Sequence, residues 1–193
     1  MFVGKKVRMR PKRQEDAFQD YSWKKDPELV GLDAATPVQM SYEEYAKGYV
    51  WELEHPAKHR RRFSIETMDG KYIGHCAFFD IDEERNDAQL GIMVADRNYW
   101  GKGYGTEAVK LLLEHGFNSL QLRTINLRSL DWNIRAHKSF LKSGFATVGE
   151  RVEDGLNFVI MRITREEWEK HHELQTDIAA GGEETTSETI EEP

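Results

Sequence analysis

Three glycines at alternate positions are the residues of this sequence best suited to chemistry. Gly101, Gly103 and Gly105 stand in the segment WGKGYG, between a run with strand character and a run with helix character. Such a turn presents main-chain N–H groups without obstruction by side chains, and the helix that follows adds a partial positive charge. The segment is therefore predicted to bind an anion, most naturally a pyrophosphate. Positive charges near that anion are expected from Lys102 and Arg97.

Two other phosphate-binding patterns compete with this interpretation, and the surrounding residues oppose both. A P-loop reads Gly-x-x-x-x-Gly-Lys-Ser/Thr, and no segment has this pattern. Gly103, Gly105 and Ala108 match the dinucleotide-binding spacing, but that motif needs an acidic residue about 20 positions further on. The sequence reads RTINLR there, over 123–128. A glycine turn that serves only close packing of a strand on a helix is a third alternative, which the residues alone leave open.

The elements around the turn follow from hydrophobic periodicity. Strands are predicted over 6–10, 62–67, 72–79, 87–94, 124–130, 145–152 and 156–163. Helices are predicted over 14–23, 45–53 and 108–120, with a short helix after Asn133 and a last one through Trp168. Strand 6–10 has the pattern of an edge strand, and Asp26-Pro27 is expected to end the first helix.

Local signals predict how these elements join. Asp-Gly pairs at 69–70 and 154–155 indicate hairpins, and Gly144 suits a left-handed helix cap. Ser41 with Glu44, and Thr164 with Glu167, have capping-box spacing. The predicted fold class is α/β, with a single mixed, mainly antiparallel sheet flanked by helices. A strand-helix-strand crossover lies in its middle, where a ligand is expected.

Composition favours one folded domain followed by an acidic tail. With 193 residues and 39% apolar content, the chain is long enough for one well-filled core. The net charge of -7 comes from the tail, because residues 173–193 contain seven acidic side chains and no Lys or Arg. Residues 1–172 are therefore predicted to form the domain, and residues 173–193 a disordered tail.

Charge balance, hydropathy and the single thiol argue against several classes of function. Residues 1–172 carry equal numbers of acidic and basic side chains, so nothing global favours binding to nucleic acid. No apolar run approaches the ~20 residues that cross a bilayer, and no signal peptide is recognised, so we expect a cytoplasmic protein without membrane contact. Cys76 is the only cysteine, which excludes an internal disulfide and a cysteine metal cluster, and no metal site is expected.

Two separated motifs resemble those of a known family. The segments AQLGIMV, over 88–94, and YWGKGYGTEA, over 99–108, resemble the cofactor segment of the GNAT N-acetyltransferases, in the branch with ribosomal-protein N-terminal and polyamine acetyltransferases. Further on, NIRA over 133–136 and KSGF over 142–145 are similar to the second signature of that family. The resemblance spans roughly residues 3–170.

The resemblance implies a fold, a donor and a reaction. Its fourth and fifth strands would splay apart, with acetyl-coenzyme A in the wedge between them. Its activity would be transfer of the acetyl group to an amine acceptor by direct attack in a ternary complex, in a monomer or a homodimer. The cofactor-binding residues that it implies are Ile92, Met93 and Val94 for the pantetheine arm, Trp100, Gly101, Lys102, Gly103, Tyr104, Gly105 and Thr106 for the pyrophosphate, and Asn133 and Phe140 of the next helix.

Two departures from the family pattern concern catalysis. Many members carry a tyrosine that protonates the leaving thiolate where this sequence has Phe140, and a glutamate base where it has Gln89. Asn133, His137 and Phe140 share one stripe of a helix, so Asn133 and His137 are the catalytic candidates. An imidazole of pKa near ~6.5 can act as the acid at neutral pH, although a half-buried structural histidine is the alternative. The candidate bases are His75, Asp80, Asp82 and Asp87.

The missing carboxylate also constrains the acceptor. At pH 7, deprotonating a lysine-like amine of pKa ~10.4 costs about 4.6 kcal/mol, whereas an α-amine near ~7.8 costs about 1 kcal/mol. A weak base therefore favours a peptide N-terminus or another amine of low pKa. A coenzyme A-binding module without catalysis, such as a sensor, is the alternative function.

Overall fold

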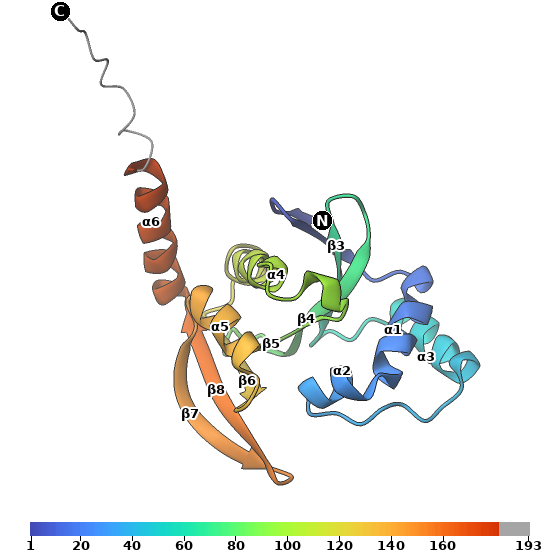
Figure 1. Ribbon diagram of the computed structural model, residues 1–193. Helices are drawn as coiled ribbons and strands as arrows, with labels where there is room; N and C mark the ends of the chain where they lie inside the picture. Colours follow the sequence, from blue (N-terminus) through green and yellow to red (C-terminus); the bar gives the residue numbers. More distant parts are fainter. Residues whose placement is uncertain (182–193) are drawn as a thin grey trace, which may run out of the picture.

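A computed structural model describes the backbone of residues 1–181, with side chains up to Glu173. Within these residues, one eight-stranded sheet has the order β1-β2-β3-β4-β5-β6-β8-β7 (Figure 1). Every neighbouring pair is antiparallel except β5 and β6, which run parallel. The predicted single, mixed and mainly antiparallel sheet is confirmed. Its strands are β1 (Phe2–Val3), β2 (Val7–Pro11), β3 (Arg61–Thr67), β4 (Tyr72–Asp82), β5 (Asp87–Val94), β6 (Thr124–Leu130), β7 (Ala146–Glu153) and β8 (Leu156–Thr164).

Two groups of helices flank the sheet. Helix α1 packs against α2 and α3, and α4 packs against α5 (Figure 1). The helices are α1 (Ala17–Lys25), α2 (Pro27–Leu32), α3 (Tyr42–Glu54), α4 (Tyr104–Glu114), α5 (Ile134–Lys142) and α6 (Arg165–Gly181). Short turns η1 (Gln14–Asp16) and η2 (Arg97–Tyr99) precede α1 and α4, and the π-helical segment η3 (His115–Ser119) follows α4.

Strand β4 separates two different environments. Side chains alternate between the faces of a strand, so Cys76 and Phe78 point to one face and His75 to the other. Cys76 and Phe78 lie in the apolar core with Leu112 of α4, and all three are almost completely buried. The ring of His75 instead lies 6.3 Å from that of Trp23 in α1. Helices α4 and α1 therefore cover opposite faces of the sheet.

Helix α2 is an element that the sequence analysis missed. Asp26-Pro27 was expected to end a helix, but it also begins the next one. The carboxylate of Asp26 accepts hydrogen bonds from the amides of Glu28 and Leu29, and Pro27 takes the first helical position, where no N–H is needed. Strand 6–10 is also not an edge strand, because β1 pairs with β2 on its outer side.

The predicted caps and turns are confirmed. Ser41 and Glu44 exchange hydrogen bonds at the start of α3, as Thr164 and Glu167 do before α6. Gly144 has a φ of 97°, in the left-handed region, directly after the end of α5. Both hairpins form where Asp-Gly pairs stand, between β3 and β4 and between β7 and β8.

The predicted boundary between domain and tail falls within helix α6. Helix α6 continues to Gly181, past residue 173, where the disordered tail was expected to begin. This stretch of sequence contains residues that favour helices, such as Leu174 and Ala179. Residues 182–193 of the predicted tail lie outside the described residues. Within residues 1–181, each helix is too short or too polar to span a bilayer.

A buried ionic cluster ties the start of α1 to the sheet. Arg10 of β2 donates two hydrogen bonds of 2.7 Å to the carboxylate of Asp16 and one of 2.7 Å to Glu66. Ser64 also donates to Asp16, over 2.7 Å. Burial acts to raise the pKa of Asp16, but the bonds from Arg10 and Ser64 outweigh it and lower the pKa. The stabilisation is therefore present above the unfolded pKa of Asp, about 3.9, and is lost as the pH falls through the folded pKa.

Replacing Asp16 with asparagine is expected to lower the free energy of unfolding by about 3 kcal/mol, because Arg10 keeps a buried charge without its main partner. Urea denaturation of the two proteins measures the difference. As a matched control, Glu43→Gln removes the exposed pair with Lys47 and is expected to cost less than about 0.5 kcal/mol. Equal losses in the two variants would contradict a special role of the buried cluster.

Candidate active site

The central strands β5 and β6 separate part-way along their length. Their parallel pairing covers Asp87, Ala88 and Gln89, opposite residues 124–126. Beyond Gln89, β5 stays paired with β4 as far as Val94, while β6 stays paired with β8 as far as Leu130. The two strands therefore diverge and leave a wedge between them, as the sequence analysis expected (Figure 1).

Close contact with β4 holds the end of β5 on its side of the wedge. Gly74 lies opposite Val94, and a Cβ at Gly74 would come within 2.1 Å of the carbonyl oxygen of Met93. Only glycine allows this approach. The amides of Ala95 and Asp96 both donate to the carbonyl of Ile73, over 2.9 and 3.1 Å, which bends the chain away from the ladder.

Main-chain donors of β5 face the wedge. Successive N–H groups of a strand point to opposite sides. Because the amide of Ala95 points to β4, those of Val94 and Ile92 point towards the side that β6 has left. The indole of Trp100 donates to the carbonyl of Val94 over 2.5 Å, which ties the glycine turn to the end of this strand.

The glycine turn presents free amides at the start of α4. Gly101 and Gly103 have φ angles of 71° and 86°, and Gly103 is the N-cap of the helix. No described residue accepts a hydrogen bond from the amides of residues 101–106. The turn is held instead by the residue that precedes β2. Lys6 Nζ donates to the carbonyl of Lys102 over 2.8 Å, and the carboxylate of Glu107 accepts from the amide of Lys6 over 2.7 Å. This arrangement is a ready site for an anion.

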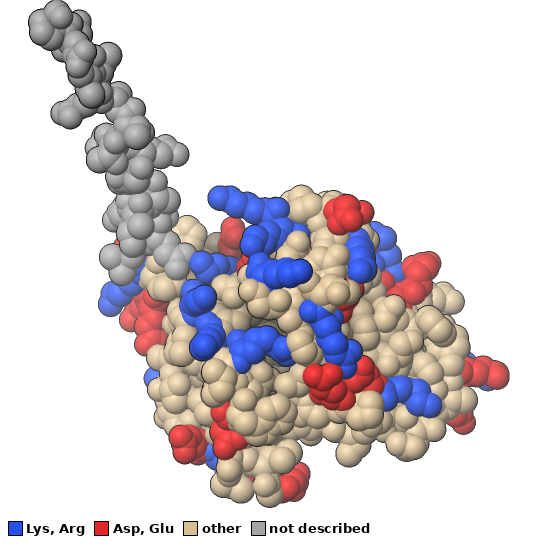
Figure 2. All heavy atoms as spheres, viewed as in Figure 1, with Lys and Arg blue, Asp and Glu red and all other residues tan. Residues whose placement is uncertain are grey.

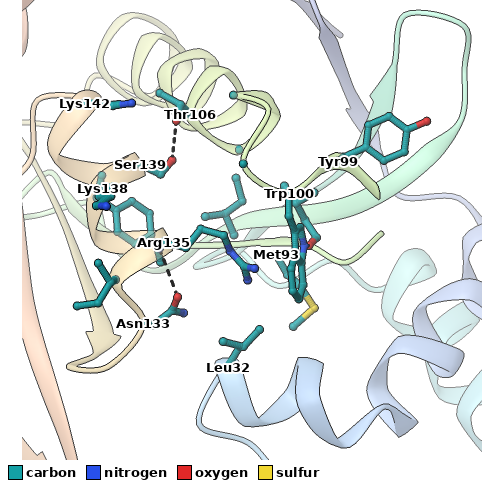
Figure 3. Close-up of a pocket in the computed structure, with 18 of the residues that line it drawn as sticks. Leu32, Met93, Tyr99, Trp100, Thr106, Asn133, Arg135, Lys138, Ser139 and Lys142 are labelled. Atoms are coloured by element: carbon teal, nitrogen blue, oxygen red, sulfur yellow. Dashed lines mark hydrogen bonds between the residues drawn. The ribbon is translucent and has the colours of Figure 1, made fainter. Parts of the chain in front are cut away.

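A cleft of about 570 Å³ joins these features. It runs from the glycine turn, past the end of β5 and along α5, to α2 (Figure 3). The residues predicted to bind the cofactor that line it are Ile92, Met93, Val94, Trp100, Gly101, Gly103, Gly105, Thr106, Asn133 and Phe140. Lys102 and Tyr104 were predicted as well but do not line it. The ring of Tyr104 packs on Tyr99 with centroids 4.8 Å apart.

The positive charges at the cleft differ from those expected. Arg97 forms ion pairs with Asp26 and Glu28, over 2.8 and 2.5 Å. These ion pairs connect η2 to the start of α2, so the charge of Arg97 is already paired. Three other cations line the cleft from α5, namely Arg135, Lys138 and Lys142. Figure 2 shows Lys and Arg side chains gathered around a hollow on this face. Their spacing of three and four residues was a helical-stripe signal that the sequence analysis did not use.

Helices α4 and α5 meet at the wall of the cleft. The hydroxyl groups of Thr106 and Ser139 are hydrogen-bonded over 2.9 Å (Figure 3). Asn133 caps α5, with its side-chain oxygen accepting from the amide of Ala136 over 3.3 Å, and its NH₂ group has no partner among the described residues. The cap expected of Asn133 is present, and its two N–H donors stay free for a ligand.

Comparison with known proteins places the chain in a family. A family model described as an acetyltransferase (GNAT) domain matches residues 6–146. The chain belongs to the GNAT acetyltransferase family. The family expected from the sequence is therefore confirmed, and the acetyl donor of this family is acetyl-coenzyme A.

Individual relatives have different acceptors. An uncharacterized N-acetyltransferase of Bacillus licheniformis, p20, is 37% identical over 52% of this chain and 59% of its own length. Spermidine N(1)-acetyltransferase of Escherichia coli K12 is 32% identical over 49% of this chain and 50% of its own length. The match therefore spans about half the length of these curated relatives. The human alpha/beta-tubulin-N-acetyltransferase 9 is 27% identical over 77% of this chain and 76% of its own length.

A solved structure shares the GNAT fold. Spermidine N-acetyltransferase from Vibrio cholerae, in complex with CoA and spermine, superposes with a TM-score of 0.77 at 20% identity. The match covers 86% of this chain and 99% of that one. At this identity the likeness concerns the fold, and it agrees with the splayed central strands of the GNAT sheet.

The structure does not bring the predicted GNAT acid to the cleft. Arg135 and Ser139 line the cleft, and His137 lies two residues from each, about half a helical turn away. His137 is not a lining residue, and its Nε2 atom is buried without a hydrogen-bond partner. Asn133, a member of the same predicted stripe, does line the cleft. Phe140 does line the cleft and packs against Phe145.

None of the predicted bases lines the cleft. His75 of β4 lies beside Asp20 of α1, with Nδ1 3.5 Å from the carboxylate, and burial lowers the pKa of its ring. Asp80 accepts a hydrogen bond of 2.9 Å from Gln89, the residue that replaces the familial glutamate. Asp82 and Asp87 lie opposite each other beside the turn of the β4–β5 hairpin.

Replacing Gly103 with alanine is expected to weaken acetyl-coenzyme A binding at least tenfold, because a side chain at this positive φ displaces amides whose bonds to a charged group are each worth about 1.5–3 kcal/mol. Calorimetric titration measures the change. Gly155→Ala is the matched control, since Gly155 has a φ of 77° with open space around it and lies in the β7–β8 hairpin. Both variants lose stability, but equal binding losses would contradict the anion site.

Replacing His137 with alanine is expected to leave kcat unchanged, because its ring does not line the cleft. Asn133→Ser is the companion variant, since serine keeps a capping oxygen but lacks the NH₂ donors, and it is expected to lower kcat/KM. Steady-state rates of coenzyme A release measure both. A lower kcat in a correctly folded H137A protein would support the original assignment of His137 as the acid.

Proposed function

We propose that this chain transfers the acetyl group of acetyl-coenzyme A to an amine by direct attack in a ternary complex. One observation carries the proposal. Amides without a described partner, in the glycine turn and at Val94, lie along one continuous cleft, as a coenzyme with a diphosphate followed by an extended arm requires. Acetyl-coenzyme A fits both features, because it has a pyrophosphate and an arm that contains amides. The coenzyme also supplies the activated acetyl thioester.

Each part of the cleft has a task in this proposal. The amides of the glycine turn hold the pyrophosphate, and Arg135, Lys138 and Lys142 offset the remaining phosphate charge. The main-chain groups of Ile92 and Val94 pair with the pantetheine arm as a neighbouring strand would. The amide of Val94 polarises the thioester carbonyl and stabilises the oxyanion that forms when the amine attacks. Asn133 donates to the acetyl end from the other side of the wedge.

Neither of the two familial proton-transfer groups is present at its usual position. Phe140 replaces the familial tyrosine, and Gln89 replaces the familial glutamate. Tyr99 lines the cleft, but its hydroxyl points away from it (Figure 3). The amine therefore loses its proton to water or buffer, and an acceptor of low pKa is favoured. A protein or peptide N-terminus fits best, and a small amine, as in the spermidine-acetylating relatives, is the other candidate.

The expected result is a preference for amines of low pKa, with peptide α-amines acetylated at pH 7 faster than spermidine by at least about tenfold in kcat/KM. The physical reason is the difference of about 3.6 kcal/mol in the cost of deprotonation. Coenzyme A release, followed with a thiol reagent across a panel of peptides and amines, measures it. The rate for spermidine is expected to rise with pH up to its amine pKa. Rapid acetylation of spermidine with no reaction of peptides would contradict the preference.

A coenzyme A-binding module without catalysis is the second candidate, and the two departures at Phe140 and Gln89 favour it. In the same panel, tight binding of acetyl-coenzyme A without turnover of any amine would select this candidate.

Two further properties belong to this proposal. We infer a cytoplasmic protein, because its one thiol, Cys76, is buried and unpaired, as suits a reducing compartment. We also infer a monomer or a homodimer, whereas one of the Vibrio cholerae structures is described as dodecameric. Light scattering of the purified protein measures its mass.

A further inference from the structure

The cleft has an uneven distribution of charge. Its lining includes three cations, all on α5, and Asp33 is the only acidic side chain among the described residues that line it. Asp33 follows α2, the helix that the sequence analysis missed. Figure 3 shows the preceding residue, Leu32, entering the cleft from α2, far from Thr106 and Lys142 at the phosphate end. The negative charge therefore lies in the half of the cleft that the donor phosphates do not use.

The carboxylate of Asp33 has no ion-pair or hydrogen-bond partner in the described part of the chain. It also stands at the C-terminal end of α2, where the helix dipole disfavours a negative charge. Asp33 is open to solvent but surrounded by the walls of the cleft, and the partial loss of hydration raises the pKa of its carboxyl. His75, Lys24 and Arg128 are the nearby positive or titratable groups, and their charges act to lower that pKa. The position does not serve the stability of the fold.

We propose that Asp33 binds a positively charged group of the acceptor, separate from the amine that receives the acetyl group. This inference rests on the proposed function. An ammonium or guanidinium group is the ligand that an unpaired carboxylate prefers. The charge it binds must be a second one, because the attacking amine has to be neutral, and a carboxylate beside that amine would hold its proton in place. The walls near Asp33 are apolar, from Leu29, Leu32 and Met93, so they suit the aliphatic stem of a lysine-like group.

The cations of α5 also influence where a positively charged acceptor binds in the cleft. Arg135 lies over the ring of Trp100, 3.4 Å from its centroid, between the two ends of the cleft. A positively charged acceptor is repelled by Arg135, Lys138 and Lys142 and attracted by Asp33. The acceptor is thereby directed to the α2 end, while the phosphates of the donor are directed to the α5 end.

The test uses two pairs of acceptors that differ in one positive charge. The first pair is Ala-Lys-Ala-Ala and Ala-Gln-Ala-Ala as C-terminal amides, which share their α-amine. The second pair is 1,4-diaminobutane and 4-aminobutan-1-ol. For the wild-type chain, kcat/KM is expected to favour the dicationic member of an acetylated pair by about tenfold, mainly through KM. Asp33→Asn is expected to reduce this preference to less than about twofold, and Asp33→Glu to retain it.

Controls separate the possible causes. Glu54→Gln removes one exposed negative charge away from the cleft and should leave the preference intact. All variants should bind acetyl-coenzyme A as the wild type does. A D33N protein that keeps the preference, or that loses kcat equally for both members of a pair, would overturn the inference, and the second result would make Asp33 a base.

The failure of this inference is distinguishable from that of the proposed function. If no acceptor is acetylated, the proposed function fails. Calorimetric binding of Ala-Lys-Ala-Ala to the coenzyme A-bound chain then still tests Asp33. Binding that D33N weakens about tenfold supports the cation site, and binding that D33N leaves unchanged excludes it.

Discussion

The structure depends on an unequal sharing of hydrogen bonds among four strands. β5 is paired along its length with β4, and β6 with β8, but β5 and β6 pair with each other at only three positions. Each of these two central strands is thus hydrogen-bonded mainly to its other neighbour, and the main-chain groups of Ile92 and Val94 that face the wedge have no strand partner. Leaving a buried donor unpaired costs about 1–3 kcal/mol. An extended ligand with its own amides removes this cost, so the wedge selects ligands that resemble a strand.

The helices on the two faces of the sheet pack against it through different kinds of contact. Under α4 the core is apolar, and its packing fixes the direction in which the helix presents its free amides. Under α1 the interface contains buried charges, with Lys12 donating to Asp20 over 2.6 Å and Tyr49 donating to the same carboxylate over 3.0 Å. Such pairs are specific in geometry rather than strongly stabilising. They hold α1 against the sheet and β2, and α2, which directly follows α1 and precedes Asp33, lines the cleft.

The sequence predicted the strands of the wedge well and the acceptor side poorly. The bounds of β5 and β6 were predicted as observed, because apolar residues alternate or run continuously between clear turn signals. The glycine turn was predictable because its chemistry lies in the main chain. Helix α2 was missed because Asp26-Pro27 is both an end and a start signal. The ion pairs of Arg97 and the place of His137 outside the cleft lining could not be predicted, because they depend on which elements become neighbours, which local periodicity does not contain.

The departures at Phe140 and Gln89 weaken proton transfer, yet they remove only part of what this fold supplies. General acid and base groups typically contribute 10²- to 10⁴-fold, or about 3–5 kcal/mol. Holding two reactants in an attacking geometry can contribute about 7–11 kcal/mol. Under the proposed function, the groove between β5 and α5 and the acidic position at Asp33, directly after α2, would supply the second contribution. A chain with this cleft therefore needs an acceptor whose amine is deprotonated at a small free-energy cost. Its selectivity among acceptors then follows from the pKa of that amine and from a second positive charge placed away from the reacting nitrogen.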